Sequence, residues 1–201
     1  PIYAPIFLPG GNGKMWSPKN YTGGYSGPVQ LRSALARSLN TVSARLALAS
    51  GPAEIAQLAH NFGVQTPLRT DITIALGSSE VTPLDQAMGY VTFARLGVPV
   101  EPVWIDRLED VRGNVVGTRG GPVVLPGADD PRGGRFAAHR AVFEPGIGVL
   151  PGAPKPRALS SGASYEVVDM LREVVRVGTA RRAYVPGYDR AGKTGTTNDY
   201  V

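Results

Sequence analysis

At 201 residues, with 42% apolar and 18% charged residues, the chain has the composition of one folded globular domain, or most of one, and not of a disordered segment. Its net charge of +5 comes without any block of five or six consecutive basic residues, so we predict no nucleic-acid partner. Cysteine is absent and the two histidines are far apart in sequence, so we predict no disulfide, metal site or other cofactor.

The first third of the chain is predicted to be a loop followed by three helices. Turn-forming residues predict the loop from Gly10 to Gly27. Apolar residues at helical spacing then predict helices near residues 28–38, 42–49 and 55–62. The tripeptide Ser38-Leu39-Asn40 is therefore expected at a junction between two helices, where a polar side chain can project into a cleft.

A fourth helix and a hairpin are predicted in the middle of the chain. Thr82 and Asp85 stand at the positions of a capping box, which predicts a helix that starts there and runs to Leu96. Residues 103–108 and 111–116 flank a turn signal and predict a hairpin or two short strands.

The last third combines an irregular segment with a further helix. Proline and glycine cluster from Gly117 to Pro156, which predicts one long irregular segment within the domain. Apolar spacing then predicts a helix from about Ser164 to Val177, and residues 188–198 are predicted to form strand and turn. Helices dominate the predicted order of elements, with strands mostly late in the chain.

The segment Lys193-Thr194-Gly195-Thr196-Thr197 places a cation, several hydroxyls and a glycine close together. Lysine supplies a positive charge for an anionic group, threonine hydroxyls can bind a carboxylate, and glycine lets a substrate backbone approach. Taken alone, such a segment is weak evidence and is more typical of a hairpin turn with an exposed lysine. Likewise, Ser38 and Asn40 alone are explained by one helix ending and the next being capped.

The pairing of the two motifs in this order is more informative than either one. Together they resemble two of the three active-site motifs of penicillin-binding proteins, and the flanking sequence resembles the bifunctional, class A members. The similar stretches are Pro18-Lys19-Asn20-Tyr21, 27–40, 75–84, 170–179 and 192–199. They cover most of the chain outside the irregular segment.

The resemblance implies a role for each motif residue. Ser38 would relay a proton near the leaving group, Asn40 would bind the acyl side chain of the substrate, and Lys193 would tune the electrostatics of the site. Thr194 and Thr196 would hold the terminal carboxylate, and the backbone N–H of Thr196 would form half of an oxyanion hole. Gly195 and Thr197 are assigned to the same substrate-binding segment.

The first motif of the family, Ser-x-x-Lys, has no counterpart here. The four lysines are Lys14, Lys19, Lys155 and Lys193, and none has a serine three residues before it. Since that serine is the nucleophile, we expect no covalent chemistry from this chain alone. The motif, the remaining C-terminal strands, a glycosyltransferase domain and a membrane anchor are expected in the parent protein, outside this chain.

The resemblance implies a helix-rich α+β fold, a partial transpeptidase domain over residues 1–201 with a helical subdomain and part of an antiparallel sheet. The implied function is that of a fragment of a D,D-transpeptidase that crosslinks peptidoglycan stem peptides, binds β-lactams and faces the periplasm at the bacterial inner membrane. Two alternatives remain: a D,D-carboxypeptidase-type serine hydrolase, and a non-catalytic module that binds cell-wall peptide or a partner protein.

Overall fold

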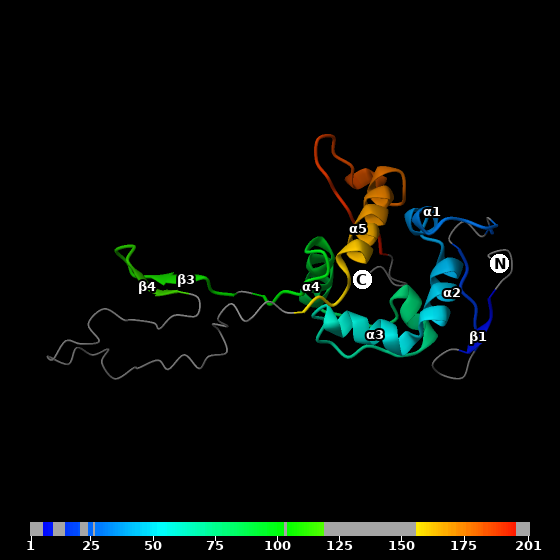
Figure 1. Cartoon of the computed structure of the whole chain (residues 1–201), viewed down its shortest axis with the longest axis horizontal. Helices are drawn as coiled ribbons and strands as arrows, with labels where there is room; N and C mark the ends of the chain where they lie inside the picture. The colour runs from blue at the N-terminus through cyan, green and yellow to red at the C-terminus, as the bar shows by residue number, and fades with distance from the viewer. Residues whose placement is uncertain are drawn as a thin grey trace. The chain divides into compact units, whose positions relative to one another are not determined.

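The computed structural model describes residues 6–9, 15–20, 24–25, 27–102, 104–118 and 156–195. The chain divides into two compact units, Pro1–Val100 with Pro156–Val201, and Glu101–Lys155. The described part of the first unit is made mainly of helices (Figure 1). None of the helices in the described ranges is long and apolar enough to cross a membrane.

A short antiparallel ribbon opens the first unit. Strands β1 (Leu8–Pro9) and β2 (Met15–Trp16) pair with Leu8 opposite Trp16. The prediction of a loop from Gly10 to Gly27 is therefore wrong at β2, because a two-residue strand is too short to show an alternating pattern. The ribbon is fixed by burial: Leu8 is part of an apolar cluster with Ala44 and Ala47, which lie on the helix Asn40–Ser50.

The three helices predicted next are confirmed with slightly different bounds: α1 (Leu31–Ala36), α2 (Asn40–Ser50) and α3 (Pro52–Asn61). The buried residues of α2 are Thr41, Val42, Ala44 and Ala47, and the two alanines belong to the apolar cluster that contains Leu8. Gly51 separates α2 from α3 with a φ of 89°, a value that glycine adopts without strain.

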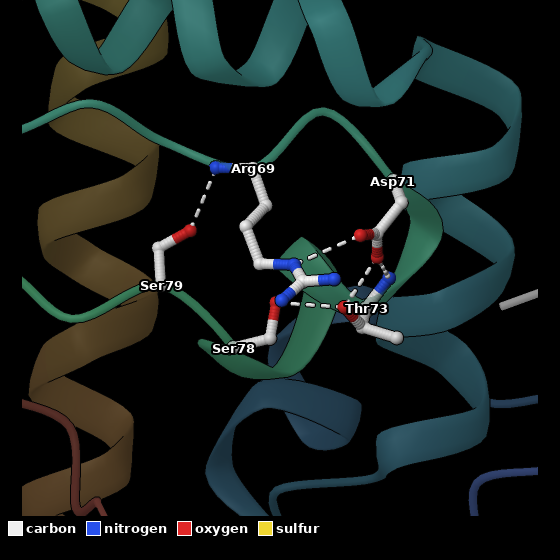
Figure 2. Close-up of polar contacts among 5 residues, drawn as sticks. All are labelled: Arg69, Asp71, Thr73, Ser78 and Ser79. Carbon is white, nitrogen blue, oxygen red and sulfur yellow. Dashed lines mark hydrogen bonds and ion pairs between the residues drawn. The ribbon is translucent and has the colours of Figure 1, made fainter. Parts of the chain in front are cut away.

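A 3₁₀ helix, η1 (Ile72–Leu76), packs against α2 and was not predicted. Figure 2 shows the polar contacts that hold it: the Asp71 carboxylate accepts hydrogen bonds from the Thr73 N–H at 3.0 Å and from Arg69 Nε at 2.9 Å. Ser78 and Ser79 close the segment, since the Ser78 hydroxyl is hydrogen-bonded to the Thr73 hydroxyl at 2.7 Å and Ser79 Oγ accepts from the Arg69 N–H at 2.9 Å. Local polar bonds of this kind carry no periodic apolar signal.

Helix α4 (Pro83–Ala94) begins with the predicted capping box at Thr82 and Asp85. The buried Asp85 carboxylate also accepts from the Gln65 N–H at 2.7 Å and the Thr66 hydroxyl at 2.5 Å. Asp85 therefore ties the loop after α3 to the start of α4. These hydrogen bonds, led by the one from the Gln65 N–H, hold the pKa of Asp85 well below its ordinary range.

We expect Asp85→Asn to lower the melting temperature of the chain at pH 7, because an amide nitrogen cannot accept the hydrogen bonds that the carboxylate accepts. A carboxyl group whose folded pKa is lowered stabilises the fold above its unfolded pKa of about 4, and this stabilisation is lost as the pH falls. The difference between wild type and variant should thus shrink below about pH 4. Thermal denaturation from pH 3 to 7 measures it, with the exposed Glu80→Gln as control; a difference independent of pH contradicts the assignment.

Helix α5 (Ser161–Arg176) packs against both α1 and α4. Its buried side chains Leu171, Val174 and Val175 form the apolar face that the sequence predicts, and a short 3₁₀ helix, η2 (Arg181–Ala183), follows it. The prediction of strand for residues 188–198 is wrong over 188–195, which form no strand. Residues 196–198 lie outside the described residues.

The second unit contains the predicted hairpin, with β3 (Arg107–Glu109) antiparallel to β4 (Val115–Thr118). The strands are shorter than predicted, and Asp110 fixes the turn between them by accepting from the Arg112 and Asn114 N–H groups at 2.8 and 2.9 Å. Apart from 117, 118 and 156, the predicted irregular segment 117–156 lies outside the described residues.

Candidate active site

Three segments of the first unit bring the predicted motif residues together. They are the turn after α1, which carries Ser38, the start of α2 with Asn40, and the segment after η2 with Lys193 and Thr194. Lys193 Nζ donates a hydrogen bond to Ser38 Oγ at 2.9 Å across 155 residues of sequence. The structure thus joins the two motifs at one contact.

Ser38 has an unusual backbone conformation. Its φ of 54° is in the left-handed region, which non-glycine residues seldom occupy. The turn is closed by hydrogen bonds from the N–H of Ser38 to the Leu35 carbonyl at 3.1 Å and from the N–H of Leu39 to the Ala34 carbonyl at 3.0 Å. Because Leu39 is buried beside Ala34 and Val42, the apolar cluster maintains this conformation. The turn ends α1 and places the half-buried Ser38 hydroxyl next to Lys193.

Asn40 is held by the segment just after β2. Its side-chain amide donates to the Lys19 carbonyl at 2.8 Å. The neighbouring Asn20, which is buried, accepts from the backbone N–H of Thr41 at 3.2 Å and from the Thr41 hydroxyl at 3.3 Å, and donates to the Gly24 carbonyl at 2.9 Å. Asn20 therefore fixes the start of α2. Sequence reasoning did not assign it a role, although it lay in one of the stretches that carried the family resemblance.

Lys193 is half-buried, and burial lowers the pKa of its ammonium group. Besides Ser38, its Nζ donates to the Thr194 carbonyl at 2.9 Å and to the Thr194 hydroxyl at 3.3 Å. An ammonium group has three N–H donors and no acceptor, so these contacts match its donors in number. A partly desolvated cation of this kind interacts more strongly with an anionic ligand than one in bulk water.

The segment carrying Lys193 is not a strand in the described residues, contrary to the prediction. It is held by α5 and the turn after it: the Gly192 N–H donates to the Leu171 carbonyl at 3.3 Å, and the hydroxyls of Thr194 and Thr179 are hydrogen-bonded at 2.7 Å. Sequence reasoning also assigned no role to Thr179. Gly195 is exposed next to Thr194, while Thr196 and Thr197 lie outside the described residues.

The arrangement suits proton transfer. A protonated Lys193 donates into Ser38 Oγ, which leaves the Ser38 proton available to a third group, and it also donates to the hydroxyl of the exposed Thr194. Within the described ranges, no group of three or more histidine, cysteine or acidic residues could hold a metal ion.

Comparison with known proteins identifies the family. The model of the penicillin-binding protein transpeptidase domain matches residues 7–201. The chain belongs to this family. The chain is 37% identical over 200 residues to penicillin-binding protein 1A of Neisseria flavescens. It is 32% identical over 213 residues to penicillin-binding protein 1A of Pseudomonas aeruginosa. These alignments cover 98% and 92% of the chain but 22% and 25% of the relatives, so the chain spans about a quarter of their length or less.

Solved structures place the transpeptidase-family chain in the same fold. Penicillin-binding protein 1A from Haemophilus influenzae superimposes with a TM-score of 0.74 at 26% identity, covering 98% of this chain and 30% of that one. Penicillin-binding protein A from M. tuberculosis, solved as an imipenem acyl-enzyme complex, superimposes with a TM-score of 0.66 at 21% identity, covering 98% and 43%. The predicted family resemblance and the helix-rich α+β fold are both confirmed.

Proposed function

We propose that this chain supplies the Ser-x-Asn and Lys-Thr-Gly walls of a D,D-transpeptidase active site whose nucleophilic serine lies elsewhere in the parent protein. The observation that carries the proposal is the 2.9 Å hydrogen bond from Lys193 Nζ to Ser38 Oγ, which joins the two motifs. The substrates are peptidoglycan stem peptides and, as inhibitors, β-lactams. The parent would be a class A enzyme with a glycosyltransferase domain and a membrane anchor, and this domain would face the periplasm.

In the proposed reaction, the nucleophilic serine attacks the carbonyl of the penultimate D-alanine and the terminal D-alanine leaves as an amine. Because Lys193 donates to Ser38 Oγ, the Ser38 hydroxyl keeps its own proton free and can pass it to that nitrogen, while the proton lost by the attacking serine replaces it on Ser38. The amine of a second stem peptide then attacks the acyl ester, and the proton it loses returns to the released serine oxygen. The positive charge of Lys193 stabilises the negative charges of the site in both steps.

The other motif residues are proposed to bind substrate. Asn40, fixed by Lys19, would hold the acyl side chain of the donor peptide. The exposed Thr194 hydroxyl would bind the terminal carboxylate with Thr196, and Gly195 would let the substrate backbone approach. The Thr196 N–H would form half of the oxyanion hole, and Thr197 belongs to the same binding segment.

Labelling by a fluorescent penicillin tests this function. We expect the full-length parent protein to form a stable adduct visible on a denaturing gel, whereas the 201-residue chain alone remains unlabelled because it has no Ser-x-x-Lys nucleophile. Stable labelling of the short chain would mean that a serine here, Ser38 first, attacks the lactam. A full-length protein that binds stem peptide without being acylated would favour the non-catalytic binding module.

Product analysis separates the transpeptidase from the carboxypeptidase alternative. With a pentapeptide donor and an amine acceptor, a transpeptidase yields the crosslinked peptide. A carboxypeptidase releases D-alanine by hydrolysis and leaves the acceptor unchanged.

A further inference from the structure

Thr179, which no motif of the sequence includes, lies directly against the candidate substrate segment. Its hydroxyl oxygen is 2.7 Å from Thr194 Oγ1, and its backbone N–H donates to the Ala36 carbonyl at 3.0 Å. Ala36 is the last residue of α1, two positions before Ser38. Thr179 is therefore anchored by its backbone to the turn that carries Ser38 and by its side chain to Thr194.

The close approach that anchors Thr179 depends on the residue before it. A Cβ at Gly178 would overlap the Ala36 carbonyl oxygen and lie 2.8 Å from the Val174 carbonyl oxygen, so only glycine fits without a backbone shift. The turn after α5 can therefore come near enough to α1 for the Thr179 N–H to reach Ala36. This contact sets the position of the Thr179 hydroxyl.

The number of donors and acceptors leaves two possible directions for the hydrogen bond between Thr179 and Thr194. A threonine hydroxyl has one proton to donate and two lone pairs to accept with. Lys193 Nζ, which in its ammonium form can only donate, takes one lone pair of Thr194 Oγ1 at 3.3 Å. If Thr179 donates into the second, the Thr194 proton is left for a further acceptor. If Thr194 instead donates to Thr179, no Thr194 proton remains for a carboxylate.

We propose that Thr179 is a positioning residue for carboxylate recognition: its hydroxyl donates to Thr194 and so directs the Thr194 proton toward the terminal carboxylate of the ligand. An anion at that position favours this direction, because a hydroxyl–carboxylate hydrogen bond is stronger than a neutral one. A chain of hydrogen bonds from Thr179 through Thr194 to the anion also strengthens each member. The inference rests on the proposed function, and it adds a residue outside the known motifs to the binding of the carboxylate.

The test compares two ligands that differ only at the carboxylate. In the full-length protein, we measure second-order acylation rates with benzylpenicillin and with its methyl ester for wild type, Thr179→Val and Thr179→Ser. Valine has the shape of threonine without the hydroxyl. We expect Thr179→Val to slow acylation by benzylpenicillin about tenfold, equivalent to one charge-assisted hydrogen bond, and acylation by the ester less than about twofold. Thr179→Ser keeps the hydroxyl, so the ratio of its acylation rates with benzylpenicillin and with the methyl ester should stay close to that of the wild type.

A double-mutant cycle with Thr194→Val completes the test. If Thr179 acts through Thr194, adding Thr179→Val to Thr194→Val should cause no further loss with benzylpenicillin. An equal loss with acid and ester, or additive losses in the cycle, would show a merely structural role and overturn the inference, as would an unchanged Thr179→Val variant. Wild-type protein that is not acylated at all would instead reject the proposed function, and this inference with it.

Discussion

Replacing Lys193 with alanine in the full-length protein is expected to slow acylation by a fluorescent penicillin by about a hundredfold or more, the usual cost of removing a donor that stabilises developing charge. The change removes the cation that donates to Ser38 at 2.9 Å and also contacts Thr194. The matched control is Arg182→Ala, which removes an exposed positive charge from the same unit and should leave the rate within about twofold. Similar losses in both variants would point to net charge and not to the Lys193 contact.

The pH dependence of the wild type gives a second measure of the role of Lys193. Burial lowers the pKa of this lysine from its ordinary value of 10.5, so the charged form is lost at a lower pH than in an exposed lysine. Because the electrostatic role proposed for Lys193 requires its charged form, acylation by benzylpenicillin should start to fall, as the pH rises, before pH 10.5 is reached. The methyl ester should show a weaker fall. A rate that stays constant up to that pH would contradict the role of the cation.

Of the substitutions considered, Gly178→Ala is expected to lower the free energy of unfolding most, by about 3 kcal/mol or more. A loss of about 3 kcal/mol is the upper end of the usual cost of forcing extra atoms into a packed site. The added methyl group would overlap the Ala36 carbonyl oxygen, a backbone atom that cannot rotate away as a side chain does. The contact between α5 and α1 must then open, and with it the hydrogen bond from the Thr179 N–H to Ala36. Urea denaturation of the chain, followed by circular dichroism, measures the change.

The matched control is Gly162→Ala in the first turn of α5. A Cβ at Gly162 meets no atom within 4 Å, and alanine is the better helix former by about 1 kcal/mol, so this variant should be as stable as wild type or more so. The two substitutions make the same chemical change near opposite ends of α5. If both substitutions shift the free energy of unfolding in the same direction, then a glycine at position 178 is not required for close packing against α1.

Much of the helical part of the fold could be predicted from the sequence, because its signals are local. The capping box of Thr82 and Asp85, the break at Gly51 and the apolar face of α5 each depend on residues within a few positions of one another. The short ribbon of Leu8 and Trp16 and the 3₁₀ helix after Asp71 escaped prediction, since two-residue strands and polar local bonds leave no periodic pattern. The strand predicted around Lys193 was wrong for residues 188–195.

By itself, the sequence determined the family and the identity of the motif residues, because side-chain chemistry and motif order can be read without coordinates. Only the tertiary structure decided which of these residues meet. Lys193 reaches Ser38 because α5 packs on α1 through Gly178 and because Ser38 occupies a left-handed turn. The same packing placed Thr179 against Thr194, a contact that no sequence pattern marks. Such contacts arise from the packing of helices far apart in the chain, and that packing depends on shape complementarity between surfaces and not on local propensity.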